Sequence, residues 1–156
     1  MKRLTVLIIL LLFSCQNKNE QIIEGDLFFK LISWGSFHKA NKEQILKYEH
    51  IFDSIENSSN PKKNDLQLIS HFKKLKKINL YTSPYIHIIK KDSSIVTLYM
   101  NDNDYKKIEN YKLTVLQNNQ KKVSLKVLAE EKEENIFFIN DIIDLKLVDG
   151  KTLMRK

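Results

Sequence analysis

Apolar residues recur with two different spacings along the chain, and the change between them separates an early helical part from a late strand-rich part. Between Asn41 and Ile78 the spacing is three or four residues, which is typical of helices with one buried face. From Pro84 onward apolar and polar residues mostly alternate, which is typical of strands. The pattern predicts an α+β fold in which two helices pack on a largely antiparallel sheet of about five to seven strands.

The two expected helices each carry a start signal. Asn41, with Gln44 three positions later, resembles a capping box for a helix that runs to about Glu56. Pro61 suits the first turn of the second helix. The apolar stripe of the first helix is expected to contain Ile45, Tyr48, Ile51, Phe52 and Ile55. That of the second is expected to contain Leu66, Leu68, Ile69, Phe72, Leu75 and Ile78.

Strands are expected on both sides of the helices. Residues 22–32 form the first strand, and the late part holds two hairpins, 85–90 with 95–100 and 111–117 with 121–129, followed by strands at 136–139 and 142–148. The acidic run Asn101 to Asp104 has Lys107 and Leu113 where a calcium-binding EF-hand needs glycine and glutamate. We therefore expect this run to connect two strands, with side chains that bond to the backbone.

The N-terminus has the pattern of an export signal. Lys2 and Arg3 precede an uninterrupted apolar run from Leu4 to Phe13. As a helix this run would span ~15 Å, about half of the hydrocarbon core, which is too short to cross a membrane. A buried N-terminal core helix is the alternative, but no polar face interrupts the run.

The end of this run decides how it would be processed. Leu12-Phe13-Ser14-Cys15 resembles the lipobox of bacterial lipoproteins, with an aliphatic residue three before the cysteine and a small one directly before it. The resemblance implies cleavage between Ser14 and Cys15, removal of residues 1–14, and attachment of fatty acyl chains such as palmitate to Cys15. Two or three such chains make a lasting anchor. In enterobacterial lipoproteins Asp after the cysteine retains the protein at the inner membrane, so Gln16 implies the outer membrane.

The expected mature chain is an anchored single domain. Residues 15–21 form the lipidated cysteine and a polar tether, and residues 22–156 form one α+β domain. Cys15 is the only cysteine, so no intrachain disulfide is available. Removal of the leader lowers the formal net charge of +7 by two. A pI near 9.3 invites a nucleic-acid partner, but an exported domain would rarely meet one. Anionic lipid, lipopolysaccharide or an envelope protein is the expected partner.

Five lysines on the second expected helix form the most pronounced charge pattern of the domain: Lys62, Lys63, Lys73, Lys74 and Lys77. We call them the lysine face. Charge runs on amphipathic helices are usually solvated surfaces, and cations near a helix C-terminus are favourably placed. The sharper hypothesis is a surface that contacts an anionic membrane or polymer, with ~1 kcal/mol available per lysine.

Candidate catalytic chemistry is sparse. Gly25, Gly35 and Gly150 are too few for phosphate-binding or nucleophile-elbow motifs. The histidines, His38, His50, His71 and His87, have no metal-ligand spacing, and no cofactor or metal is expected. Glu24 and Asp26 would share one face of the first strand with Lys30. Paired carboxylates can serve acid/base chemistry, but a half-exposed strand gives the same pattern.

The expected function is that of a membrane-anchored, non-enzymatic binding module. The segment Gly25 to Lys30 also resembles one in uncharacterised small envelope lipoproteins of AT-rich Gram-negative bacteria, a likeness that implies no activity. Phe28, Phe29, Trp34 and Phe37 form a dense aromatic group, whose inward-facing members are expected in the core. Trp34 and Phe37, if they lie on the loop, are expected to form a partner patch or to enter the membrane interface. Two alternatives stay open: an exported hydrolase or transferase that uses a carboxylate or histidine, and an inhibitor or immunity lipoprotein.

Overall fold

The structure is a computed structural model that describes residues 19–30, 37–38, 41–117, 120–151 and 154–155. The leader, Ser14, Cys15 and Trp34 lie outside these residues, so the expectations for them stay predictions. None of the helices in the described residues is both long enough and apolar enough to span a membrane.

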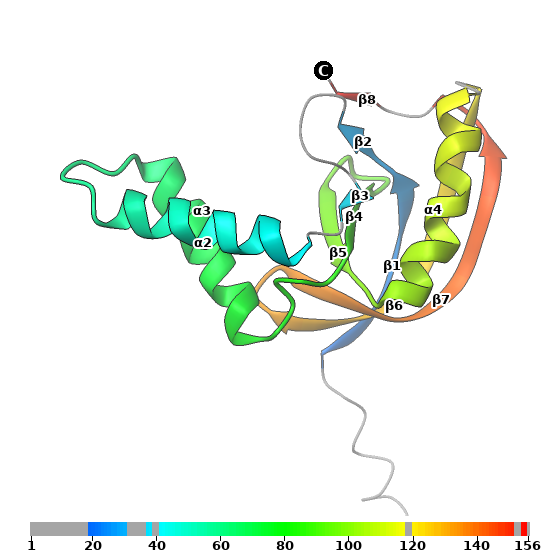
Figure 1. Cartoon of the computed structure of the whole chain (residues 1–156). Helices are drawn as coiled ribbons and strands as arrows, with labels where there is room; N and C mark the ends of the chain where they lie inside the picture. The colour runs from blue at the N-terminus through cyan, green and yellow to red at the C-terminus, as the bar shows by residue number, and fades with distance from the viewer. Residues whose placement is uncertain (1–18, 31–36, 39–40, 118–119, 152–153, 156) are drawn as a thin grey trace, which may run out of the picture.

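A closed barrel of five strands forms the body of the molecule (Figure 1). Its strands are β1 (Glu20–Leu27), β4 (Tyr85–Ile89), β5 (Ile95–Tyr99), β6 (Lys121–Glu133) and β7 (Ile136–Asp149). Around the barrel they follow the order β1-β6-β7-β5-β4, and β1 also pairs with β4, which closes the ring. The β5–β7 pair is parallel and the other neighbours are antiparallel. The α+β class is therefore confirmed, and the sheet that was expected to be largely antiparallel closes into a mixed barrel.

The barrel interior is filled by side chains that alternate along the strands. Ile86 and Ile88 of β4 are fully buried, and so are Leu98 of β5 and Val123 and Val127 of β6. These residues form one core together with Ile23, Leu27, Met100, Tyr105, Ile108, Leu125, Ala129 and Ile139. Every second residue of these strands points inward and is apolar. This alternation is the pattern that predicted the β4–β5 hairpin, and the hairpin is confirmed.

Two helices form a hairpin that projects from one side of the barrel (Figure 1). They are α2 (Lys42–Glu56) and α3 (Lys63–Lys77). The capping box of α2 is confirmed, since the Gln44 amide donates to the Asn41 side chain and the Asn41 amide donates to the Gln44 side chain. The second helix starts later than expected, with Lys62 as N-cap, so Pro61 lies before the helix.

The apolar stripes of this hairpin are only partly buried. Ile45, Ile69 and Leu75 are buried, whereas Leu66 and Leu68 are 42% and 56% exposed. The stripes are only partly covered because the hairpin stands beside the barrel and the far ends of its helices contact chiefly each other.

A third helix, α4 (Asp102–Gln117), replaces an expected connection and strand. Asn101 accepts a hydrogen bond from the Asp104 amide at 2.9 Å, so the acidic run caps a helix instead of linking two strands. Tyr105 and Ile108 enter the barrel core and Tyr111 packs against it. The strand expected at residues 111–117 is therefore wrong, because the turn-by-turn spacing of these apolar residues suits a helix that covers the barrel.

Three strand boundaries differ from expectation. β1 begins at Glu20, so the last two residues of the expected tether pair with β6, and it ends at Leu27. The two strands expected at 136–139 and 142–148 are one strand, β7, whose pairing with β6 is interrupted by bulges. Short strands complete the structure: β2 (Phe29–Lys30) with β8 (Met154–Arg155), and β3 (Phe37–His38) on β4.

Candidate functional site

The lysine face lies along α3 and divides into two groups. Lys73 donates to Glu56 at 2.6 Å, while the Nζ atoms of Lys74 and Lys77 each lie 3.8 Å from a carboxylate of the β6–β7 turn. These two carboxylates belong to Glu134 and Glu133. Lys62 and Lys63 lie exposed at the opposite end of the helix. Among the described residues, no ion pair is formed by these two.

The ion pairs change what the lysine face offers to a partner. The C-terminal lysines border a groove of about 430 Å³, which is lined by Glu56, Leu66, Ile69, Ser70, Lys73, Lys74 and Lys77. Each of its lysines already faces a carboxylate, so an anionic ligand would have to compete with a glutamate. Lys76, which the pattern did not single out, bonds to Glu49 at 2.6 Å, and this bond raises the pKa of Lys76. The lysine face is therefore a solvated surface whose lysines at the C-terminal end of α3 form ion pairs.

Glu24 and Asp26 of β1 lie on the outer face of the barrel, and each is paired with a lysine. Asp26 accepts a hydrogen bond from Lys122 of β6 at 2.6 Å, and Glu24 lies 3.5 Å from the Nζ of Lys91. Both border a polar cleft of about 420 Å³ at the closure of the barrel. Because each carboxylate has its own cation, the arrangement fits a charged strand surface better than a pair that shares a proton.

The histidines that the structure describes with side chains each have different surroundings. His50 is exposed on α2, and His87 on β4 forms a 2.9 Å hydrogen bond with Thr97 of the neighbouring strand. The Nε2 of His71 lies 3.3 Å from the hydroxyl of Tyr99. Partial burial and the nearby Lys74 lower the pKa of His71. Within the described part of the chain, no cluster of three or more His, Cys, Asp or Glu side chains could hold a metal ion.

An aromatic layer joins the helical hairpin to the outer face of the barrel. The Phe52 and Phe72 rings lie 4.9 Å apart between the two helices, and the cross-strand rings of Tyr85 and Tyr99 lie 5.6 Å apart on the barrel. Tyr81 links the two pairs, because its ring centroid lies 6.3 Å from that of Phe72 and its side chain packs against the cluster that contains Tyr99. Burial raises the pKa of both tyrosines. The layer packs two parts of the fold together, and the spacing of these residues gave no signal of it. Phe28, from the expected aromatic group, is buried, as predicted for a core residue.

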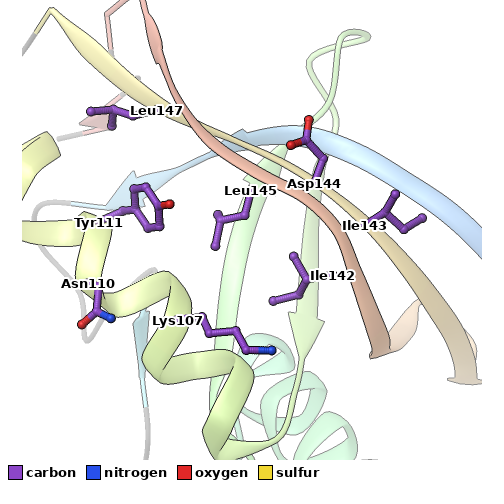
Figure 2. Close-up of a pocket in the computed structure, with 8 residues that line it drawn as sticks. All are labelled: Lys107, Asn110, Tyr111, Ile142, Ile143, Asp144, Leu145 and Leu147. Carbon is purple, nitrogen blue, oxygen red and sulfur yellow. The ribbon is translucent and has the colours of Figure 1, made fainter.

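The groove between α4 and β7 was not foreseen from the sequence, because residues 111–117 were expected to form a strand. It has a volume of about 630 Å³, within the size range of ligand-binding clefts. Figure 2 shows the residues that line it: Lys107, Asn110 and Tyr111 from α4, and Ile142, Ile143, Asp144, Leu145 and Leu147 from β7.

The groove combines an apolar floor with charged groups that are already paired. Leu145 and Leu147 are half-buried against the core, whereas Ile143 is 48% exposed. On the α4 side Lys107 donates to Asp104 at 2.8 Å, which raises the pKa of Lys107. On the strand side Asp144 accepts from Lys146 at 2.6 Å. Neither wall presents an uncompensated charge at its rim, so the groove is suited to an uncharged, apolar ligand.

Comparisons with known proteins add no evidence on function, so the assignment of a function depends on the features described above. No protein-family model matches the chain, and neither a curated protein nor a solved structure does.

Proposed function

We propose that this chain is a lipid-anchored protein of the bacterial cell envelope whose barrel is a non-enzymatic binding module. The leader and the lipobox-like residues before Cys15 support the anchor. By the same resemblance, the outer membrane is the proposed location. The partner is an envelope component: a protein, an anionic lipid or lipopolysaccharide.

The observation that carries the binding role is the filled barrel. Its central residues, among them Ile86, Leu98 and Val127, have no exposed surface, so the barrel has no interior room for a substrate. A partner must therefore bind on the outside. The alternative of an exported enzyme loses support, because Glu24 and Asp26 are each held in an ion pair with a lysine.

The order of the strands around the barrel also supports a binding module. Counted along the chain, the five barrel strands lie in the order 1-2-3-5-4, with α4 between the third and the fourth. This is the connectivity of the OB-fold, a five-stranded barrel that often serves as a binding scaffold. Fold alone does not assign a partner, so the binding role depends on the surface features described above.

The start of β1 keeps the module close to the anchor. Glu20, the first residue of β1, comes five positions after Cys15, and an extended chain over these five steps reaches ~18 Å. The barrel therefore works next to the bilayer, and a partner must be present there.

Processing at Cys15 tests the anchor directly. We expect the intact mass of the full chain, purified from membranes, to show loss of residues 1–14 and the addition of acyl chains. Cys15→Ala should abolish both changes, because the acylated sulfur is lost. Ser14→Ala is the matched control, since it keeps a small residue before the cysteine and should be processed normally. Cleavage at the same bond in Cys15→Ala, or an unmodified native protein with its leader intact, would refute the proposal.

A further inference from the structure

The second half of β7 has one hydrogen-bonded neighbour where most strands of a barrel have two. β7 pairs with β5 only through Phe137 and Phe138, opposite Leu98 and Tyr99. From Ile139 onward its partner, within the described residues, is β6 alone. Backbone N–H and C=O groups point alternately to the two sides of a strand. About half of those between Ile139 and Asp149 therefore face away from β6.

The groove beside α4 runs along this edge. Side chains alternate between the two faces of a strand, so a hollow on one face contacts every second residue. Here four consecutive residues, 142–145, line the groove. In Figure 2 Leu145 lies on the α4 side of β7 and Asp144 points away from Lys107. The groove consequently follows the backbone edge and both faces next to it.

A bulge in the β6–β7 ladder lies at Ile143, in the part of β7 that lines the groove. Val127 of β6 pairs with Ile142 and Lys126 pairs with Asp144, so Ile143 has no partner in the ladder. Its side chain is 48% exposed. Charged residues are common at strand edges, and Asp144 and Lys146 follow on this strand, but position 143 itself carries an isoleucine.

We propose that the β7 edge binds an extended, uncharged segment of another envelope protein, which adds a strand beside residues 139–149 and places alternate apolar side chains in the α4–β7 groove. Added strands gain affinity from main-chain hydrogen bonds and specificity from pockets for alternate side chains. The proposal rests on the binding role proposed above and names the chemistry of the partner.

Two observations select this occupant. The charged groups of the rim, Lys107 and Asp144, are already paired, which disfavours a charged ligand. A second copy of the chain would bring its own α4 beside its β7 edge. The two helices would then compete for the same groove, whereas a single extended segment carries no such obstruction.

The test uses the full-length anchored protein in detergent micelles and an array of fluorescent, uncharged peptides of about eight residues that alternate Val, Ile or Leu with Ser or Thr. We expect a subset to bind in fluorescence anisotropy with Kd in the range of ~10–100 μM. N-methylation of alternate amides in the best peptide should weaken binding at least about tenfold in one of the two registers, because it removes the donors to β7.

A matched pair of variants locates the site. Ile143→Lys should weaken binding at least about tenfold, and Ile95→Lys, at an exposed strand position of β5 outside the groove, should leave it unchanged. The proposal fails if no peptide binds at about 1 mM, if both N-methylated registers bind like the parent, or if Ile95→Lys is as weak as Ile143→Lys. It also fails if the parent sediments as a dimer and Ile143→Lys sediments as a monomer, because a second copy of the chain would then be the occupant.

The N-methylated probes leave the protein unaltered, so the test stands even if Ile143→Lys folds poorly. Failure here is distinguishable from failure of the anchor. An unmodified protein that binds these peptides would refute the lipoprotein assignment alone, and a lipidated protein that binds none would refute the edge proposal alone.

Discussion

At Gly25 the backbone of β1 passes close to another strand at the point where the barrel closes. Its neighbour Asp26 lies opposite both Ser124 of β6 and Ile89 of β4. A Cβ atom at position 25 would lie 2.6 Å from the carbonyl oxygen of Ile89, a distance that real Cβ atoms do not adopt. Closure therefore requires a residue without a side chain here.

Gly25→Ala should consequently destabilise the fold by roughly 1–3 kcal/mol, because the strands must separate to admit the methyl group. Urea unfolding of the parent and the variant measures the difference. Ser124→Ala, on the partner strand, adds no atoms and should stay within about 0.5 kcal/mol of the parent. A Gly25→Ala protein as stable as the Ser124→Ala control would contradict the close approach.

His71 predicts a pH dependence of stability. Its pKa lies below the ordinary 6.5, first because of partial burial and second because of Lys74. Below pH 6.5 the unfolded chain therefore binds more protons than the folded one at this site. The His71 contribution is fully present above pH 6.5 and is lost as the pH falls toward the folded pKa.

We expect the unfolding free energy of the parent to fall more steeply than that of His71→Gln between about pH 7 and pH 5. His50→Gln, at an exposed position of α2, is the control and should keep the slope of the parent. Equal slopes in the parent and His71→Gln would show that the environment of this imidazole is not what the structure indicates.

Among the elements, α4 is the one whose local signals conflict. Residues 111–117 contain Tyr, Thr and Val, which favour strands. Upstream, Asn101 caps the helix through the Asp104 amide, and Ile108 is fully buried in the barrel core. The cap and the core contact outweigh the strand preference of the last turns, which explains why a strand was expected and a helix is observed.

Asn101→Ala should therefore cost about 1 kcal/mol of unfolding free energy, since it removes the acceptor for the Asp104 amide. Asn103→Ala, an exposed asparagine in the first turn of the same helix, should change stability by less than about 0.5 kcal/mol. Thermal and urea unfolding both report this difference. Equal effects of the two substitutions would refute the capping role.

At the scale of the whole molecule, the fold divides into a densely packed barrel and a projecting hairpin (Figure 1). The barrel core includes Ile108 of α4, whereas the α2–α3 hairpin joins the barrel through a smaller cluster that contains Leu75 and Tyr99. Local stability follows the density of buried apolar contacts. The hairpin should therefore open without unfolding of the barrel.

Hydrogen exchange of the native protein should show this difference. Amides in the middle of α2 should exchange at least about tenfold faster than those of β6. Amides of α4 near Ile108 provide a helix-to-helix comparison and should exchange as slowly as the barrel. Uniform protection of α2, α4 and β6 would mean that the hairpin and the barrel unfold as a single unit.

Features that depend on neighbouring residues were predictable from the sequence. The α+β class, the start of α2 at Asn41 and the β4–β5 hairpin all match. Each depends on residues a few positions apart, so the local sequence is enough to predict their interactions. The lysines of α3 were also identified, but their partners Glu133 and Glu134 are distant in sequence, so the ion pairs could not be read from it.

By itself the sequence determined three local elements, α2, α3 and the β4–β5 hairpin. It also predicts the leader and the lipid anchor at Cys15. Only the tertiary structure decided the closure of β1 on β4, the parallel pairing of β5 with β7, and the helical state of residues 111–117. The α4–β7 groove follows from these contacts. They join residues distant along the chain, and their free energy depends on how well side chains fill the shared interior, which no short stretch of sequence encodes.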